Sequence, residues 1–339
     1  MDYREAGVDI SAADEAKDRI KKLARGTFNA GVLSEIGSFG GMFRPDLSGL
    51  REPVLVASTD SVGTKTKVAI LAGIHDSVGH DIVNHCVNDI LVQGAVPLFF
   101  LDYLAVGKID VDKVEAIVRG LAAACSEVGC PLIGGETAQM PDVYAPEDYD
   151  LAGFIVGVVD REKALTGAAV AEGDILLGLP SSGLHTNGYT LARKVLFGAM
   201  GHGVDTEVAE LGTTVGAALL APHRSYLSAL EPLLERRKIH ALAHITGGGF
   251  PGNIPRVLPP GLTARVRKGA WEVPPLFRLI QKGGTVSEDE MYRTFNMGIG
   301  MVVIVGPGDL HDVEHSLERR GETSFVIGSV VKGSGVTLE

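Results

Sequence analysis

Short apolar runs alternate with longer amphipathic stretches along the chain. In the first half, the short runs predict strands at residues 53–57, 98–106, 132–133 and 151–159. Apolar positions that recur every three or four residues predict helices around 19–23 and at 65–72, 77–93 and 114–128, the last capped by Asp112. Alternating strands and helices are typical of sheets with helices packed against them.

A glycine- and charge-rich stretch at residues 160–174 interrupts this pattern, and a second series of elements follows it. Its strands are expected at 175–179, 239–245, 263–267, 298–305 and 325–331, and its helices at 189–198, 222–237, 254–258, 274–281 and 310–320. A chain of 339 residues exceeds the size at which one hydrophobic core usually stops growing. We therefore expect two domains, residues 1–167 and 168–339.

The net charge and the cysteine content exclude several classes of function. The formal net charge is −11, and an acidic chain lacks the basic surface that nucleic acids require. It would hold anionic phosphates with the help of a divalent cation. Three cysteines without a C-x-x-C pair argue against a disulfide framework or zinc site. Residues 1–6 lack the apolar core of a signal peptide and no apolar run is long enough for a membrane span, so we expect a cytoplasmic protein.

Three segments of the first half, residues 58–65, 87–89 and 134–141, combine one carboxylate with small or neutral polar residues. The first and third follow apolar runs, so we interpret them as loops at strand ends, where backbone amides can converge on a ligand. Magnesium prefers oxygen ligands, which are available from Asp60, Asp89 and Glu136. The neighbours that would approach nucleotide phosphates are Thr64, Lys65, Asn88, Gly134 and Gly135.

A simpler alternative is that Asp60 and Asn88 cap helices and that the glycines only shape turns. The occurrence of three such segments together favours the phosphate and magnesium interpretation. No G-x-x-x-x-G-K-[ST] loop occurs. A G-x-G-x-x-G pattern does occur at residues 247–252, but prolines interrupt the following helix too early for a dinucleotide-binding unit. We therefore interpret the loop at 246–249 as a contact for one phosphate or ribose.

The histidines have competing interpretations. His185 lies among hydroxyl and amide residues of the loop at 181–189, which favours a substrate contact over a structural hydrogen bond. His244 fits either role. Asp81 and His85 share a helix face with Asp89, and because such pairs commonly stabilise helices we interpret Asp81 and His85 as helix-surface or interhelical residues. The basic run at 236–238 ends a helix, where cations complement the helix dipole.

Several motifs, in one order along the whole chain, resemble those of the aminoimidazole ribonucleotide synthetases, also called phosphoribosylformylglycinamidine cyclo-ligases. They lie at residues 3–10, 59–65, 86–89, 97–103, 134–141, 181–189, 244–249, 253–259 and 290–298. The set is specific, because only single loops such as Asp-x-x-Gly-Thr-Lys are shared with thiamine-monophosphate kinases and selenophosphate synthetases. Two positions depart from the family pattern: Ser61 replaces a common glycine, and Gln139 replaces a common glutamate.

The resemblance implies an ATP- and Mg²⁺-dependent ligase of purine biosynthesis. It would convert formylglycinamidine ribonucleotide to 5-aminoimidazole ribonucleotide, ADP and phosphate through an iminophosphate. The implied fold is a two-domain α+β or α/β fold: a mainly antiparallel N-terminal sheet with helices pairs across a homodimer into a barrel, and a C-terminal mixed sheet with packed helices follows.

The same resemblance implies roles for individual residues. ATP would lie near the dimer interface and contact Lys21 and Gly40, beside the phosphate-binding residues named above. The metal would be held by Asp60, Asp89 and Glu136. Catalysis would involve Asp60, Lys65 and His185. The ribonucleotide would face Ser181, His185, Asn187, Thr246, Gly247, Gly248 and Gly249.

Two other functions stay open. Another ATP-dependent kinase or synthetase would use the same acids, although selenophosphate synthesis is disfavoured because no cysteine precedes Cys86. A catalytically silent nucleotide-binding subunit would bind ATP without releasing ADP.

Overall fold

The N-terminal domain is built on one four-stranded sheet. The computed structural model describes residues 10–339, so nearly all of the motif at 3–10 and the charged start of the chain lie outside the described residues. The strands are β1 (Pro53–Ser61), β2 (Val96–Val106), β3 (Leu132–Gln139) and β4 (Tyr149–Asp160), in the spatial order β1-β4-β2-β3. β4 is antiparallel to β1 and β2, whereas β3 is parallel to β2.

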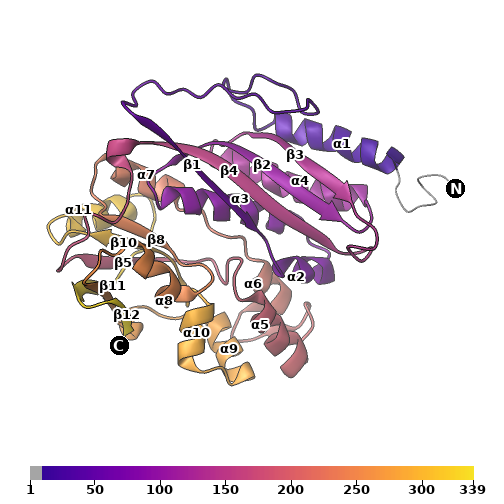
Figure 1. The fold of residues 1–339 in the computed structure, drawn as a ribbon. Coiled ribbons are helices and arrows are strands. Elements are labelled where there is room, and N and C mark those ends of the chain that lie inside the picture. The colour runs from indigo at the N-terminus through magenta and orange to yellow at the C-terminus, as the bar shows by residue number, and fades with distance from the viewer. Residues whose placement is uncertain (1–9) are drawn as a thin grey trace.

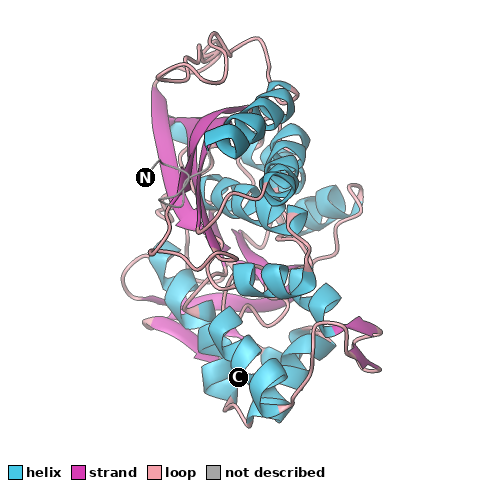
Figure 2. Cartoon of the chain, turned by 90° about the vertical axis from the view of Figure 1, so that its right-hand side faces the viewer, coloured by secondary structure: helices cyan, strands magenta, loops and turns pink. Residues whose placement is uncertain are grey.

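Helices cover one face of this sheet and leave the other face open (Figure 2). They are α1 (Ile10–Arg25), α3 (Asp76–Leu91) and α4 (Val111–Glu127), and the shorter α2 (Lys65–Ala72) follows β1. α3 and α4 cross closely, because a Cβ on Gly120 would lie 1.9 Å from the carbonyl oxygen of Asp76. The open face carries large apolar side chains, with Leu55 66% and Phe154 43% exposed.

The C-terminal domain contains a six-stranded sheet in the order β12-β9-β11-β5-β10-β8 (Figure 1). Its strands are β5 (Ile175–Pro180), β8 (Ala241–His244), β9 (Leu262–Val266), β10 (Ile299–Val305), β11 (Phe325–Lys332) and β12 (Gly335–Leu338). All pairs are antiparallel except β12 with β9, so the sheet is mixed. A separate hairpin joins β6 (Glu207–Val208) to β7 (Thr213–Thr214).

Helices of the C-terminal domain are mostly short. They are α5 (Tyr189–Arg193), which continues as a π-helical turn at Lys194–Ala199, α6 (Val215–Leu220), α7 (Leu227–Glu235), α8 (Gly249–Asn253), α9 (Pro275–Gly284), α10 (Glu288–Thr294) and α11 (Leu310–Glu318). The prediction of two mixed α+β units is confirmed. The domain boundary near residue 167 and the barrel across a dimer stay predictions.

The first and third acidic segments begin as strands rather than as loops, which corrects the sequence interpretation. Residues 58–61 continue β1 because they pair with residues 152–155 of β4. Residues 87–89 belong to α3, and residues 134–139 form most of β3 because they pair with β2. The cap of α4 is Asp110, whose side chain accepts a hydrogen bond from the Lys113 amide, rather than Asp112. The pattern also missed α6, α10, β6, β7 and β12.

Within residues 10–339, no helix is both long enough and apolar enough to cross a bilayer.

Candidate functional site

Helix α3 lies between the N-terminal sheet and the C-terminal domain (Figure 1), and three of its residues are candidates for the site. Asp81, His85 and Asp89 recur every four residues and share one helix face. The C-terminal domain covers this face: Asp81 is fully buried and His85 is 3% exposed. Neither is a helix-surface residue. Asp81 is interhelical, because it pairs with Lys65 of α2, and both Asp81 and His85 also contact the docked second domain.

Asp60, His85, Asp89 and His244 form a continuous group that we name the acid-histidine cluster. Nε2 of His85 lies 2.8 Å from Oδ2 of Asp60 and 3.6 Å from Oδ2 of Asp89. The other oxygen of Asp89 lies 2.8 Å from Nδ1 of His244. Asp60 comes from β1, His85 and Asp89 from α3, and His244 from the end of β8. The cluster thus brings two of the expected metal carboxylates of the N-terminal domain together with His244 of the C-terminal domain.

Contacts with histidines together affect the pKa values of the two acids in this cluster more strongly than burial does. Burial alone would raise the pKa of Asp60 and Asp89, but hydrogen bonds and charges from His85 and His244 hold both below the usual value. Burial works against protonation of His85, yet the two carboxylates raise its pKa. Burial lowers the pKa of His244. The place between the two carboxylates therefore favours a positive charge.

A second pair of histidines lies behind the cluster. Nε2 of His223 lies 3.0 Å from Nε2 of His244, and the His223 ring stacks on His185 with ring centroids 3.9 Å apart. Thr186 Oγ1 connects the two groups, 2.7 Å from Nδ1 of His85 and 3.5 Å from Nδ1 of His223. Sequence reasoning missed His223, because it lies in the loop between α6 and α7 without periodicity or motif.

His185 is buried, 1% exposed, rather than open to a substrate. Its φ of 61° is uncommon for a residue other than glycine. Nε2 accepts a hydrogen bond from the Ser182 amide at 3.2 Å, and Nδ1 is buried without a partner among residues 10–339. Burial, first of all, and nearby positive groups lower its pKa well below the usual value. The neutral ring therefore stabilises the loop at 181–189 by accepting a hydrogen bond from a backbone amide of the same loop.

Lys65 holds the two domains together. Its side chain is fully buried and forms a 2.8 Å ion pair with Asp81. The same ammonium donates to the carbonyl oxygens of His185 at 3.1 Å and Ala221 at 2.8 Å in the C-terminal domain. Burial lowers the pKa of Lys65 and raises that of Asp81, and the ion pair opposes both shifts. All three donor directions of the ammonium are used, which leaves none for the phosphate contact expected of Lys65.

Thr64 and Asn88 also contact the second domain. Thr64 Oγ1 lies 3.0 Å from Thr190 Oγ1. Asn88 is fully buried, donates to the Arg224 carbonyl at 2.8 Å and accepts from the Tyr226 amide at 3.0 Å. Both ends of the Asn88 side chain are thus occupied by protein, so it anchors the start of α7.

The acid-histidine cluster borders a cavity of about 540 Å³ between the domains. Polar lining comes from Ser58 and Asp89 on one side and from His244, Thr246, Asn253 and Arg256 on the other. Of the described residues that line it, Arg256 is the one lysine or arginine. The cavity thus combines one acid, one histidine and one cation from separate elements.

The loops at 181–189 and 246–249 lie side by side. A Cβ on Gly247 would lie 3.1 Å from Oδ1 of Asn187. Gly248 and Gly249 have φ values of 93° and 57°, and a Cβ on Gly249 would lie 1.8 Å from the Tyr292 carbonyl oxygen. Only glycine fits this turn. Ser181 is turned inward and contacts the Gly183 carbonyl at 2.9 Å.

β3 keeps Glu136 away from Asp60. Asp60 pairs with Gly153, Gly153 with Asp102, and Asp102 with Gly135. Glu136 follows Gly135, so it points to the opposite face of the sheet from Asp60 and lies three strands away, about 14 Å at ~4.8 Å per strand. The expected trio of metal carboxylates is therefore not assembled within one chain.

Lys21 and Gly40 lie on the β3 side of the sheet with Gly134 and Gly135. Lys21 belongs to α1, which packs on α4 and β3. The segment containing Gly40 approaches the same strand, because a Cβ on Gly41 would lie 2.8 Å from the Ile133 carbonyl oxygen. Within one chain, the residues expected near ATP therefore form two separate groups. One group lies at β3, and the other, with Asp60 and Asp89, lies at the end of β1.

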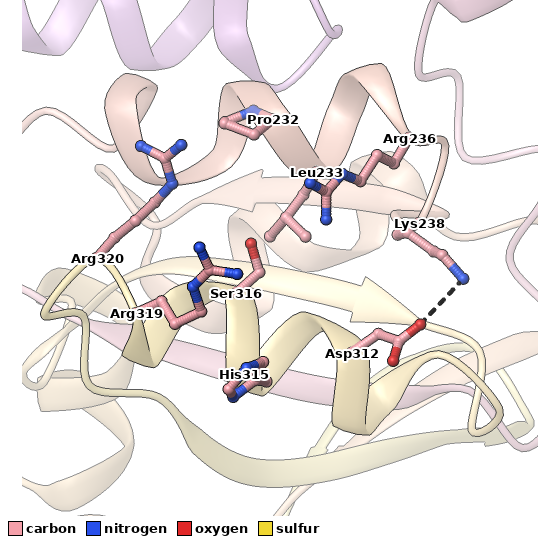
Figure 3. Close-up of a pocket in the computed structure, with 9 residues that line it drawn as sticks. All are labelled: Pro232, Leu233, Arg236, Lys238, Asp312, His315, Ser316, Arg319 and Arg320. Atoms are coloured by element: carbon pink, nitrogen blue, oxygen red, sulfur yellow. Dashed lines mark ion pairs between the residues drawn. The ribbon is translucent and has the colours of Figure 1, made fainter.

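A second pocket, between α7 and α11, is rich in arginine (Figure 3). Arg236, Arg319 and Arg320 lie around it, and Lys238 pairs with Asp312 at 3.4 Å. It contains no residue of the acid-histidine cluster. Arg236 and Arg319 stand at the C-terminal ends of α7 and α11, where cations complement the helix dipole.

Comparisons with known proteins agree along the whole chain. The model "AIR synthase related protein, N-terminal domain" matches residues 47–159, and "AIR synthase related protein, C-terminal domain" matches residues 171–339. A phosphoribosylformylglycinamidine cyclo-ligase of Brevibacillus brevis is 51% identical over 331 residues, 98% of this chain and 96% of the relative. One from Sorangium cellulosum is 52% identical over 339 residues, 99% of this chain and 97% of the relative.

Solved structures share the fold at low sequence identity. Thiamine-monophosphate kinase from Stenotrophomonas maltophilia is similar with a TM-score of 0.68 at 18% identity, covering 96% of each chain. HypE from E. coli has a TM-score of 0.67 at 19% identity, covering 95% of this chain and 92% of the other. A hydrogenase maturation protein HypE in complex with ATP has a TM-score of 0.63 at 20% identity, covering 94% and 88%.

Proposed function

The chain belongs to the phosphoribosylformylglycinamidine cyclo-ligase family, and from that premise we propose how its two domains divide the chemistry. The enzyme is an ATP-dependent ligase of purine biosynthesis that cyclises formylglycinamidine ribonucleotide to 5-aminoimidazole ribonucleotide. The observation that carries the proposal is the 2.8 Å contact of Asp89 with His244, which places one acid of the N-terminal domain and the glycine loop of the C-terminal domain on a single cavity.

Asp60 and Asp89 are the residues that would hold Mg²⁺. Their carboxylates both face Nε2 of His85 from two elements, keep pKa values below the usual one and are partly exposed, 41% and 28%. These are properties that suit a hard divalent cation. When bound, the cation would neutralise charge on the transferring phosphoryl group. Glu136 lies on the other face, so it would contribute only through the dimer.

The reaction needs activation of an unreactive amide oxygen. Transfer of a phosphoryl group to that oxygen gives an iminophosphate, from which phosphate departs when the amidine nitrogen closes the ring. The attacking nitrogen must lose a proton, and we assign its acceptance to the Asp89 and His244 pair, because both line the cavity and Asp89 orients the imidazole. His185, buried and neutral, becomes a positioning residue for the loop at 181–189.

The ribonucleotide is proposed to lie along Asn187 and the glycine loop from Thr246 to Gly249. Arg256 is the cation available in the cavity for its phosphate. Ser181 would act by shaping the loop, since its hydroxyl faces the protein. Because ring closure is intramolecular, the cavity would contribute by holding the amidine nitrogen in a reactive orientation toward the activated formyl carbon.

The enzyme is proposed to act as a cytoplasmic homodimer, paired through the open sheet face. That face exposes Leu55 and Phe154, which alternate with Asp60 along the pleat and so point away from the helices. Contiguous exposed apolar side chains on one face are typical of an interaction surface. Pairing there would also bring the partner close to Glu136, which points to the same face, and ATP is proposed to lie near this interface.

Phe154→Glu is expected to convert the dimer to a monomer, because it buries a charge in the proposed apolar interface. Sedimentation velocity measures the change. Leu71→Glu, at a side chain on α2 that is 60% exposed, is the matched control and should leave the dimer intact. A Phe154→Glu protein that sediments as the wild type would contradict pairing through this face.

The activity itself is tested by incubating the protein with ATP, Mg²⁺ and one of three additions: formylglycinamidine ribonucleotide, thiamine monophosphate or buffer. We expect ADP, phosphate and ring product with the amidine alone. ADP formation with thiamine monophosphate would indicate a kinase, and ATP binding without ADP would indicate a silent nucleotide-binding subunit.

A further inference from the structure

The Asn253 side chain is buried behind the glycine loop at 246–249 and is hydrogen-bonded to that loop at both ends. It is 4% exposed and stands at the end of α8. Its Nδ2 lies 2.8 Å from the Gly249 carbonyl oxygen and 3.3 Å from those of Thr246 and Gly247. Its Oδ1 lies 3.2 Å from Thr246 Oγ1. Because carbonyl oxygens only accept hydrogen bonds, the nitrogen must face them and the oxygen must face the hydroxyl group.

These contacts occupy the carbonyl groups of the loop and leave its first amides without partners. All four carbonyl oxygens of residues 246–249 accept hydrogen bonds, three from Asn253 and one from the Gly252 amide at 3.0 Å. By contrast, the amides of residues 246–248 have no hydrogen-bond partner among residues 10–339, and the last two of these residues are exposed. Adjacent amides of this kind can bind the oxygen atoms of an anionic group.

A loop of consecutive glycines depends on such contacts for its order. Glycine loses more conformational freedom on ordering than any other residue, and residues 247–249 have no side chains that could pack. Without Asn253, the substrate itself would have to order the loop, which would weaken its binding. With Asn253 in place, the loop is ordered before the substrate arrives.

Stabilisation of α8 alone does not account for these contacts. An asparagine in a short helix can donate to the carbonyl oxygen four residues earlier, as Asn253 does to Gly249. The contacts with Thr246 and Gly247 lie outside the helix, in the segment that precedes it. Asn253 therefore connects the loop to the helix that follows.

The neighbouring loop at 181–189 is held in the same way by Asn296, which is 2% exposed. Its Nδ2 donates to the Gly183 carbonyl oxygen at 2.9 Å, and its Oδ1 lies 3.0 Å from Ser181 Oγ. Both loops that are proposed to face the ribonucleotide thus have a buried asparagine behind them.

We propose that Asn253 is a positioning residue for the ribonucleotide: it keeps the loop at 246–249 ordered, with the amides of residues 246–248 available to the substrate's phosphate. The proposal rests on the proposed function, in which the ribonucleotide lies along this loop and Arg256 is the cation for its phosphate. Asn253 and Arg256 line the same cavity. Because Asn253 acts through the loop rather than on the reacting atoms, its loss should weaken ribonucleotide binding and leave the chemical step nearly unchanged.

Steady-state kinetics of the full-length Asn253→Asp protein tests the proposal. The oxygen that replaces Nδ2 would face three carbonyl oxygens without the two hydrogens that the amide donates. We expect KM for formylglycinamidine ribonucleotide to rise about 10–100-fold, while KM for ATP and kcat change less than about twofold. A merely structural defect would instead reduce the amount of active enzyme, which lowers the apparent kcat and leaves both KM values unchanged.

Thr263→Val is the matched control. Thr263 is 5% exposed, and its hydroxyl group contacts the carbonyl oxygens of Ser334 and Gly335 at 3.3 and 2.9 Å. It belongs to β9, which three strands separate from β8, the strand that leads into the glycine loop. The variant removes a buried donor from two carbonyl oxygens far from the loop, so it should keep both wild-type KM values.

Asn253→Ser is a milder variant that keeps one hydroxyl donor. It should fold and raise KM for the ribonucleotide about tenfold, because part of the hydrogen bonding to the loop is lost. It provides the test if Asn253→Asp does not fold, which thermal unfolding of each variant reveals. A folded Asn253→Asp or Asn253→Ser protein with wild-type KM for the ribonucleotide would overturn the proposal.

Arg256→Met separates this failure from failure of the proposed function. Arg256 is exposed, so its replacement should leave the fold intact. If Arg256→Met raises KM for the ribonucleotide while both Asn253 variants do not, the substrate lies in this cavity and the loop does not depend on Asn253. If all three variants keep the wild-type KM, the ribonucleotide binds elsewhere and both proposals fall.

Discussion

Asp60→Asn is expected to lower kcat by about 10²–10³-fold or more while the protein stays folded, because one charged ligand of the proposed cation site is lost. Asparagine has nearly the same shape as aspartate and keeps one oxygen that can accept from the Ser61 amide, now at 2.7 Å. The Asp60 side chain is also 41% exposed, so its neutralisation costs the fold little. Production of ADP and ring product, measured together with a thermal unfolding curve, checks both parts of the expectation.

The matched control is Asp205→Asn, at an exposed carboxylate of the C-terminal domain. It removes the same charge from the chain and should retain wild-type kcat. Near-normal turnover of Asp60→Asn with ATP and magnesium would show that this carboxylate is not needed for the cation. A large loss in both variants would instead point to the net charge of the protein.

Lys65→Met should destabilise the protein by about 3–5 kcal/mol, because it leaves a buried carboxylate without its cation. Asp81 would keep the hydrogen bond from the His223 amide at 2.7 Å, and the C-terminal domain would lose the two carbonyl contacts of the ammonium. The free energy of unfolding, measured by urea denaturation at fixed protein concentration, reports the change.

The loss of stability in Lys65→Met should depend on pH, and it should be larger at neutral pH than in acid. Burial raises the pKa of Asp81 above its ordinary value of 3.8, so the folded variant binds a proton more readily than the unfolded chain. Stability of Lys65→Met is therefore greatest below that ordinary value and decreases as pH rises through the raised pKa. The penalty relative to wild type should be smaller in acid than at neutral pH.

Two variants test whether the ion pair explains the loss. Lys67→Met removes a partly exposed lysine of the same helix that pairs with Asp148, and it should cost less than about 1 kcal/mol. Adding Asp81→Asn to Lys65→Met removes the unpaired charge and should recover much of the stability. A Lys65→Met protein with wild-type stability and no turnover would restore the phosphate-binding role that the sequence suggested for Lys65.

The sequence predicted most elements because burial of one face leaves a local periodic signal. The apolar run at 98–106 and the amphipathic stretch at 114–128 correspond to β2 and α4. The prediction failed where polar residues are held by pairing rather than by periodicity. Residues 134–139 look like a glycine loop, yet β2 draws them into β3, and the polar sequence of α10 shows no strong apolar stripe.

The candidate site was predicted only in part. Asp60 and Asp89 were identified as carboxylates that belong together, and the motif order indicated the family. The predicted phosphate contact of Lys65 was wrong, because its ammonium binds Asp81 and two carbonyl oxygens instead. No local pattern distinguishes a lysine that reaches solvent from one that reaches a second domain. Glu136 was grouped with the wrong acids, because its direction depends on how β3 aligns with β2.

The sequence by itself determined most of the elements and the identity of the acids, since these depend on neighbours within one helix or strand. Only the tertiary structure decided that His85 stands between Asp60 and Asp89, and that His244 meets Asp89 from 155 residues away. Contacts over such separations depend on how the domains dock, and docking is set by the shapes and charges of two whole surfaces. A local pattern of apolar and polar residues therefore does not indicate which residues meet across the domain interface.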